Sequence, residues 1–232
     1  MNSIQKNLAR IRTQIKSTAE KAGRDPTVIK LVAVSKRVPW QRVEEAVGCG
    51  QAIFGENYIQ EAQAKISYLK ETLSWHFIGH LQSNKVKQAA QIFDVIETID
   101  RLELAVLLNN HMEKSNRTIS IFIQVNIGQE PQKSGIHPDH AEELLRKTNN
   151  LKNLKVMGLM AIPPFFDNPE MVRPYYKQMR EMLDDFETKG LLGRHGQPEL
   201  SMGMSNDFEV AIEEGATLIR LGTAVFGPRH ES

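Results

Sequence analysis

The sequence predicts an α/β fold of the (β/α)8 TIM-barrel class, with residues 1–232 forming a single domain. Three observations predict it. Eight short, nearly continuous apolar runs follow one another along the chain, which suits parallel strands buried on both faces. Helical patterns separate these runs, and 232 residues is about the length of one such barrel. A doubly wound open sheet has the same alternation, so the even spacing of eight units is what favours the barrel.

The predicted strands are short and rich in β-branched and other apolar residues. In chain order they cover residues 31–34, 51–54, 75–78, 94–97, 119–125, 156–160, 199–202 and 217–221. The run at 119–125 is the strongest, because Ile, Phe and Val dominate it, whereas the runs at 94–97 and 199–202 are weaker. Short runs of this kind, closed by Gly or polar residues, mark the positions where strands end and loops begin.

An extra amphipathic helix over residues 3–22 precedes the first strand. Ile4, Leu8, Ile11 and Ile15 recur at spacings of three and four, which places them on one helical face, and Gly23 predicts the end of the helix. The other predicted helices cover residues 42–47, 57–70, 84–92, 102–112, 138–146, 171–188 and 208–214. Only a short segment remains after Gly222 for a final helix, so we expect no second domain.

Local motifs support three of the helix starts. Asp100 with Glu103 and Asn206 with Glu209 have the spacing of capping boxes, in which two side chains satisfy free backbone N–H groups. Pro138 suits the first position of a helix, where its missing N–H is not needed.

Composition excludes several classes of function. The 29 Lys and Arg residues balance 28 Asp and Glu residues, so no general affinity for nucleic acid or anionic membranes is expected. The only cysteine, Cys49, rules out an internal disulfide and a multi-cysteine zinc site, and the seven histidines lack ligand-like spacing, so we predict no metal. No segment is long and apolar enough for a transmembrane helix, and the polar N-terminus is not a signal peptide. We expect a cytoplasmic protein.

The carboxyl ends of barrel strands are where active groups of this fold lie, and Lys36 follows the first predicted strand. An amine at an apolar rim is desolvated, which lowers its pKa and makes it a nucleophile suited to a Schiff base with a carbonyl compound. The alternative is a lysine that caps the strand and extends to water. Strand position alone favours that alternative.

The loops after the seventh and eighth strands favour the interpretation of Lys36 as a nucleophile, because these loops form the usual phosphate site of this fold. Glycines and hydroxyls supply donors there: Ser201, Gly203, Ser205, Gly222 and Thr223. Capping of the following helix by Ser205 or Asn206 is the alternative, and it is compatible with phosphate binding. A lysine and a phosphate site at one barrel mouth suit a phosphorylated aldehyde, either pyridoxal 5′-phosphate (PLP) or a phosphosugar. Spacing does not separate the two.

Two further residues, Asn57 and His80, have a functional and a structural interpretation, and two more, Arg220 and His76, have a structural one. Asn57 follows the second strand and either binds a ligand oxygen or caps a helix, and His80 either contacts a ligand or serves as a structural donor. Arg220 lies inside an apolar strand and must have a partner, for which an internal glutamate such as Glu56 is the structural candidate. His76, within the third strand, is expected to be a satisfied buried residue.

Six segments carry a resemblance to a known family. They are AVSK at 33–36, FGENYIQEAQAK at 54–65, WHFIGHLQSNK at 75–85, MGLMAI at 157–162, LSMGMSNDFEVAI at 200–212 and IRLGTAVFG at 219–227. Together they span nearly the whole chain. The sequence resembles the pyridoxal phosphate homeostasis protein family, the YggS/PROSC-type PLP-binding proteins.

The resemblance implies a barrel like the N-terminal domain of alanine racemase, a PLP enzyme of fold type III, and PLP as cofactor. It implies that Lys36 holds PLP as a Schiff base and that Arg220 faces the cofactor near its pyridine nitrogen, with Asn57 and His80 beside it. By the same carry-over, the residues around the phosphate are Ser201, Met202, Gly203, Gly222 and Thr223.

The leading hypothesis from the resemblance is a non-catalytic PLP-binding protein that serves intracellular PLP and amino-acid homeostasis, with PLP-dependent apo-enzymes as candidate partners. A monomer is expected, since no partner domain is needed to complete the site. The alternative is a PLP-dependent amino-acid racemase or lyase of narrow specificity, which needs a second proton donor such as His80 or Tyr58. A Schiff-base aldolase or phosphosugar isomerase is a third hypothesis, and it requires no PLP.

Overall fold

The computed structural model describes residues 3–69 and 72–228, and over these residues eight parallel strands close into a barrel in the order β1 to β8. The strands are β1 (Lys30–Val34), β2 (Ile53–Glu56), β3 (Ser74–Phe77), β4 (Val95–Ile99), β5 (Ile119–Val125), β6 (Leu154–Ala161), β7 (Glu199–Ser201) and β8 (Leu218–Leu221). Because β8 pairs with β1, the sheet has no free edge, and the open doubly wound sheet is excluded. The predicted fold class is confirmed.

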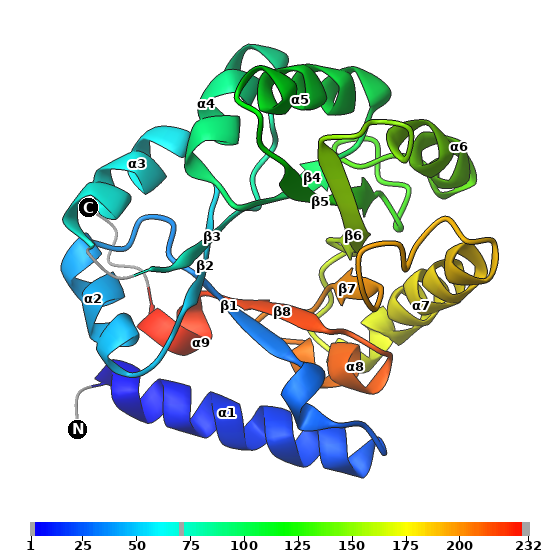
Figure 1. The fold of residues 1–232 in the computed structure, drawn as a ribbon. Coiled ribbons are helices and arrows are strands. Elements are labelled where there is room, and N and C mark those ends of the chain that lie inside the picture. Colours follow the sequence, from blue (N-terminus) through cyan, green and yellow to red (C-terminus); the bar gives the residue numbers. More distant parts are fainter. Residues whose placement is uncertain (1–2, 70–71, 229–232) are drawn as a thin grey trace.

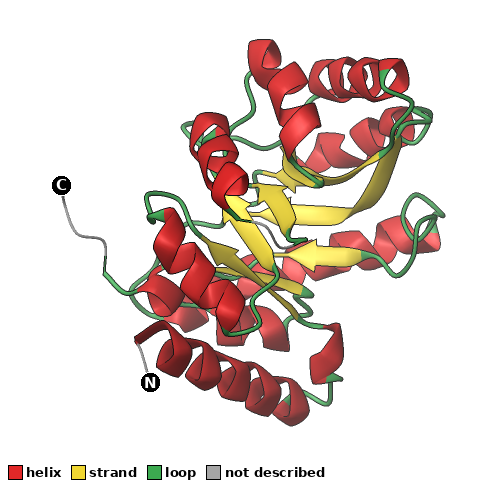
Figure 2. Ribbon diagram, turned by 60° about the vertical axis from the view of Figure 1, so that its left-hand side comes forward, coloured by secondary structure: helices red, strands yellow, loops and turns green. Residues whose placement is uncertain are grey.

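Helices surround the strands on the outside, as Figure 1 shows along the barrel and Figure 2 from another side. They are α1 (Ser3–Lys21), α2 (Trp40–Gly48), α3 (Ile59–Tyr68), α4 (Val86–Ile92), α5 (Leu102–Lys114), α6 (Pro138–Thr148), α7 (Arg173–Thr188), α8 (Phe208–Glu213) and α9 (Thr223–Phe226). Short 3₁₀ turns precede β1, α4 and α7: η1 (Pro26–Val28), η2 (Ser83–Lys85) and η3 (Pro169–Val172). None of the helices over the described residues combines the length and apolarity needed to cross a membrane.

Helix α1 closes the ring where β8 meets β1 (Figure 1). Its apolar face buries Ile4, Leu8, Ile11 and Ile15 and packs against α2, α8 and α9. The helix that follows β8 is a short one, so α1 supplies the cover that α9 is too short to give. Gly23 ends α1 as predicted: its φ of +68° is the left-handed conformation of a helix terminus.

Both predicted capping boxes are wrong, although Pro138 does open α6 as predicted. The Asp100 carboxylate pairs with Arg101 at 2.8 Å and accepts the Gly135 N–H at 3.3 Å, so it does not cap α5. The Asn206 amide donates to the Phe166 carbonyl at 3.1 Å, and α8 begins at Phe208. In both cases a tertiary contact replaces the local motif. The predicted end of the third helix, residue 70, lies outside the described residues.

The register of the strands shows which side chains point into the barrel. Val32, Phe122, Met160 and Leu218 come from four strands and form a buried cluster separate from the main core, so they meet inside the barrel. Residues that are level on neighbouring strands share a face. Arg220 is level with Val32, Ser201 with Met160, and His76 with Gly55, whose added Cβ would contact Val32. The interior therefore holds polar groups as well as apolar ones.

Candidate functional site

A hollow of about 340 Å³ opens at the carboxyl ends of the strands, where active groups of this fold lie. Five of the nine residues that the resemblance places around the cofactor line it together: Lys36, Asn57, Arg220, Gly222 and Thr223. The remaining lining residues are Val34, Ile78, Ile162, Phe165, Met204, Ser205, Asn206 and Asp207. Strands and loops that are far apart in sequence thus bring a lysine, an arginine and two hydroxyl groups to one place.

Lys36 reaches the hollow because of where β1 ends. Val32 points into the barrel and side chains alternate along a strand, so Val34 and then Lys36 follow on the same side. Ser35, between them, is fully buried on the other side. The chain turns at Arg37, whose φ of +60° is unusual for a residue with a side chain.

Arg220 is held beneath the hollow by a buried network that crosses the barrel interior. Its Nη1 donates to Ser201 Oγ at 2.6 Å and its Nη2 to the Ala161 carbonyl at 2.8 Å. Ser201 Oγ in turn donates to Glu97 Oε2 at 2.6 Å, and His76 Nδ1 lies 2.6 Å from Glu97 Oε1. Both carboxylate oxygens of Glu97 are therefore bonded.

The ion-pair partner suggested for Arg220, Glu56, is wrong. Glu97 Oε2 lies 4.0 Å from Arg220 Nη1 inside the barrel, whereas Glu56 points outward from β2 and pairs with Lys65 of α3 at 2.6 Å. His76 is a satisfied buried residue, as expected. Burial raises the pKa of the Glu97 carboxyl, whereas His76, Arg220 and Ser201 lower it. Their combined effect is larger than that of burial, so the pKa lies below its ordinary value. The carboxylate stays ionised and balances Arg220.

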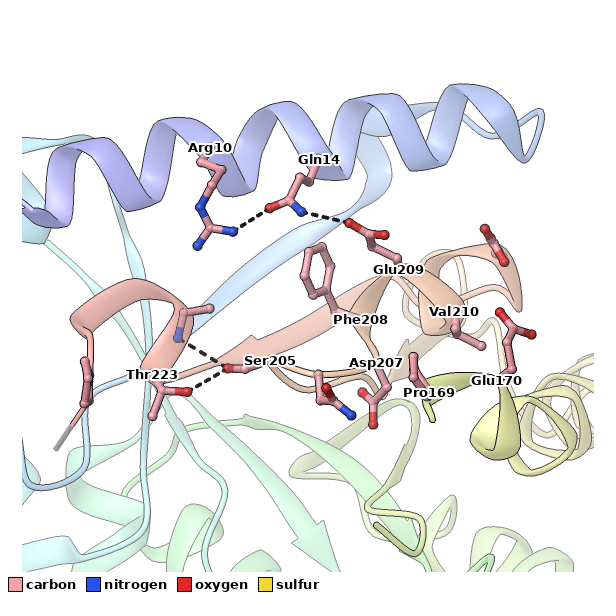
Figure 3. A pocket seen from close by; sticks show the side chains of 14 residues that line it. Arg10, Gln14, Pro169, Glu170, Ser205, Asp207, Phe208, Glu209, Val210 and Thr223 are labelled. Carbon is pink, nitrogen blue, oxygen red and sulfur yellow. Dashed lines mark hydrogen bonds between the residues drawn. The ribbon is translucent and has the colours of Figure 1, made fainter. Parts of the chain in front are cut away.

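Hydroxyl groups and a backbone amide converge between the loops after β7 and β8. Ser205 Oγ accepts from Thr223 Oγ1 at 3.3 Å and from the Ala224 N–H at 3.4 Å, as Figure 3 shows. Neither Ser205 nor Asn206 caps α8, so the capping alternative for this loop is wrong. The cap alternative for Asn57 is also wrong, because α3 begins at Ile59 after Tyr58.

The structure does not bring four of the predicted residues into the hollow. Ser201 is buried below it in the Arg220 network, and Met202 is fully buried in the core. Gly203 has a φ of +94°, and a Cβ there would lie 2.6 Å from the Cβ of Ala211, so this glycine allows α8 to pack closely. His80 lines a neighbouring hollow, and its Nδ1 lies 2.9 Å from Ser134 Oγ.

The apolar wall of the hollow was not predicted from the sequence. Ile162 and Phe165 follow β6, and Met204 follows β7. Phe165 is 70% exposed although it lines the hollow. The rule that selected Lys36, namely position after a strand, applies to these residues too. Their apolar side chains simply carried no chemical signal.

A larger hollow of about 730 Å³ lies outside the barrel between α1, α8 and α9 (Figure 3). Hydrogen bonds join some of its lining residues: Arg10 donates to Gln14 at 3.0 Å, and Gln14 donates to Glu209 at 2.9 Å. Ser205 and Thr223 line this hollow as well as the hollow at Lys36. Among the described residues no lysine lines the larger hollow, so the smaller hollow, which holds Lys36 and Arg220, is the better candidate. Over the described residues, no group of three or more His, Cys, Asp or Glu side chains could hold a metal ion.

The chain is similar to known proteins along nearly its whole length. Residues 4–230 match the family model for the N-terminal domain of alanine racemase. The chain is 44% identical over 230 residues to the pyridoxal phosphate homeostasis protein of Aquifex aeolicus (strain VF5), covering 99% of both chains. It is similar to the PLP-bound structure of PipY from Synechococcus elongatus PCC7942, with 34% identity, a TM-score of 0.85 and coverage of 97% of this chain and 100% of PipY.

A more distant likeness shows the fold alone. An alanine racemase structure from Clostridium difficile 630 is 15% identical, with a TM-score of 0.71. The match covers 98% of this chain and 57% of the racemase.

Proposed function

The chain belongs to the pyridoxal phosphate homeostasis protein family, and from this premise we propose that it binds PLP in the hollow at Lys36. It is a non-catalytic PLP-binding protein that takes part in PLP and amino-acid homeostasis. One observation carries the proposal: Lys36, Arg220 and the Ser205–Thr223 hydroxyl pair line a single hollow.

The chemistry of these side chains fits the three reactive parts of PLP. The Lys36 amine would hold the aldehyde carbon of PLP covalently, with loss of one water. The hydroxyls of Ser205 and Thr223 and the Ala224 N–H are donors for the phosphate oxygens. Arg220 lines the same hollow, and the resemblance implies that it would face the pyridine nitrogen. A hollow of about 340 Å³ is within the range of small-molecule sites.

Asn57 supplies an independent sign of a missing polar partner. Its side-chain oxygen is buried and accepts no hydrogen bond from the described residues, although buried polar atoms are normally bonded. The same side chain lines both the hollow at Lys36 and the neighbouring hollow at His80. We propose that the Asn57 side chain contacts the edge of the cofactor. The roles predicted for Met202, Gly203 and His80 remain predictions. Ser201 acts on the cofactor through Arg220.

The charge on Arg220 supports binding without catalysis. PLP supplies an electron sink whose strength depends on protonation of the pyridine nitrogen. A guanidinium beside that nitrogen, paired with Glu97, disfavours a second positive charge there and so weakens that sink.

The racemase or lyase alternative requires a second proton donor near Lys36. Its two candidates, Tyr58 and His80, line the neighbouring hollow and not the hollow at Lys36. The likeness to alanine racemase extends to the fold only, so it adds no support for catalysis.

The test is an absorption spectrum of the purified protein with PLP, before and after borohydride, followed by peptide mass mapping. We expect a visible band that borohydride removes, leaving a pyridoxyl group on Lys36. The variant Lys36→Ala should lose the band and retain PLP about tenfold less well. The control variant Lys85→Ala, altered in the neighbouring hollow, should behave like the wild type. An adduct elsewhere in the wild-type chain, or none, would overturn the proposal and favour a phosphosugar ligand.

We also propose that residues 1–232 form one domain that works as a monomer in the cytoplasm and passes PLP to apo-enzymes. Sedimentation of the PLP-bound protein tests the monomer, cell fractionation tests the cytoplasmic location, and transfer of PLP to an apo-enzyme tests the delivery.

A further inference from the structure

We propose that Lys65 and Glu61 of α3 are positioning residues that fix the backbone on both sides of Lys36 from outside the barrel. The inference rests on the proposed role of Lys36 as the attachment point of PLP. Neither residue lines the hollow at Lys36. They act on the two peptide groups that flank it.

Each of these peptide groups is held by one member of the pair. Lys65 Nζ donates to the Ser35 carbonyl at 2.6 Å, which belongs to the peptide before Lys36. The Arg37 N–H, which belongs to the peptide after Lys36, donates to Glu61 Oε1. Because Lys65 Nζ also donates to the same Glu61 oxygen at 2.7 Å, one ion pair joins both contacts.

The burial of Lys65 indicates that this arrangement is specific. Its side chain is only 6% exposed, and a buried ammonium is costly unless its donors are satisfied. Lys65 Nζ has an acceptor for each of its three N–H groups: the Ser35 carbonyl, Glu61 and Glu56. Glu56 Oε1 also accepts from Ser35 Oγ at 2.6 Å, which ties the residue before Lys36 a second time.

We call the contacts of Lys65 and Glu61 with the two peptide groups beside Lys36 the clamp. The turn after Lys36 explains why this clamp is needed. Arg37 has a φ of +60°, a conformation that side chains disfavour and that persists only where the surroundings enforce it. The Val38 N–H donates to the Ser35 carbonyl at 2.9 Å, so this carbonyl closes the turn and also receives Lys65. Glu61 holds the N–H of the strained residue itself.

The expected consequence concerns how readily Lys36 meets its aldehyde. A lysine side chain has several rotatable bonds, so the direction of its backbone decides how often the amine lies in position. Small displacements of a reacting group slow a reaction severalfold to about a hundredfold. Release of the clamp should therefore slow capture of PLP without removing any group that touches it.

The experiment compares two substitutions at one position. Glu61→Gln keeps the Oε1 acceptor for the Arg37 N–H, whereas Glu61→Ala removes it. We expect Glu61→Ala to slow formation of the visible band by about tenfold after mixing with PLP, and Glu61→Gln to stay within about twofold of the wild type. Rates are normalised to the folded fraction, measured by circular dichroism and thermal unfolding of the protein without PLP.

Two further variants separate positioning from folding. The double variant Lys65→Met with Glu56→Gln removes the Lys65 contact to the Ser35 carbonyl without leaving Glu56 charged and unpaired, and it should be slow as well. Glu143→Ala breaks an equivalent ion pair on α6, where Glu143 Oε1 lies 2.7 Å from Lys147 Nζ four residues on. It should leave the rate unchanged.

The outcomes distinguish this inference from the function on which it rests. If the wild type yields no borohydride adduct on Lys36, the proposed function fails. If the wild type yields that adduct and folded Glu61→Ala captures PLP as fast as Glu61→Gln, the positioning role is refuted. A rate loss equal in Glu61→Ala and Glu143→Ala also overturns it.

Discussion

Glu97 and Glu56 are two fully buried glutamates in one barrel, and burial has opposite results for them. The side chains of both are 0% exposed. The pKa of Glu97 lies below its ordinary value, while the pKa of Glu56 lies above it. Burial favours the neutral form of each carboxyl to begin with. The difference therefore comes from the partners that each strand face provides.

Glu97 points into the barrel, where groups from three other strands surround it. His76 from β3 and Ser201 from β7 each bond one of its oxygens, and Arg220 from β8 adds a positive charge nearby. Together these groups outweigh burial. The carboxylate can then keep a cation under the hollow where PLP is proposed to bind.

Glu56 points outward, between the strands and α3. Only its Oε1 is bonded, by Lys65 and Ser35, while its Oε2 has no hydrogen-bond partner among the described residues. Burial raises the pKa of Glu56, Lys65 and Ser35 lower it by less, and the charge of Glu61 raises it again. Glu97, inside the barrel, thus acts as a negative charge beside Arg220. Glu56, outside the strands, acts chiefly as a hydrogen-bond acceptor for Lys65 and Ser35.

The largest expected effect follows from removing the charge inside the barrel. We expect Glu97→Gln to lower the free energy of unfolding by about 3 kcal/mol, because Arg220 is left buried without its counter-charge. Urea unfolding of the protein without PLP, extrapolated to zero denaturant, measures it. If Glu97→Gln lowered the free energy of unfolding by no more than Glu56→Gln does, the two carboxyls would contribute equally to stability, contrary to the contrast drawn here.

The matched substitution outside the barrel should cost less. We expect Glu56→Gln to lower the free energy of unfolding by about 1 kcal/mol, because the amide keeps the Oε1 acceptor and Lys65 keeps Glu61 and the Ser35 carbonyl. The same urea experiment provides the value. A loss of about 3 kcal/mol or more would show that Lys65 depends on the Glu56 charge, contrary to the assignment of Glu56 as an acceptor.

The alternation of the sequence predicts the barrel well because strand and helix periods are local. The eight apolar runs lie within a few residues of the observed strands, and the position of Lys36 after the first of them is correct. The rule that loops at the carboxyl ends meet also brings Arg220, Gly222 and Thr223 to the same hollow.

Partner choice could not be predicted, because it depends on which face of a strand a residue occupies. Glu56 follows Gly55, which faces the interior, so the alternation of side chains sends Glu56 outward. Glu97 lies beyond a register shift in β4 that no local pattern reveals. The spacing of Glu61 and Lys65 predicts a helical ion pair, but only the tertiary structure shows that this pair holds the two peptides beside Lys36.

The smallest effect expected is the pH dependence, and its sign differs between the two carboxyls. The folded-state pKa of Glu97 is below its ordinary value of 4.5, so its contribution to stability is present above that pH and is lost as the pH falls through the folded pKa. The folded-state pKa of Glu56 is above 4.5, so its contribution is present below that pH and is lost as the pH rises through the folded pKa.

Each variant can be compared with the wild type from about pH 3 to about pH 7 by urea unfolding. The stability advantage of the wild type over Glu97→Gln should grow as the pH rises toward and past 4.5. Its advantage over Glu56→Gln should shrink above 4.5. If both differences changed in the same direction, the opposite pKa directions would be wrong, and with them the claim that the strand face, and not burial, determines the state of each carboxyl.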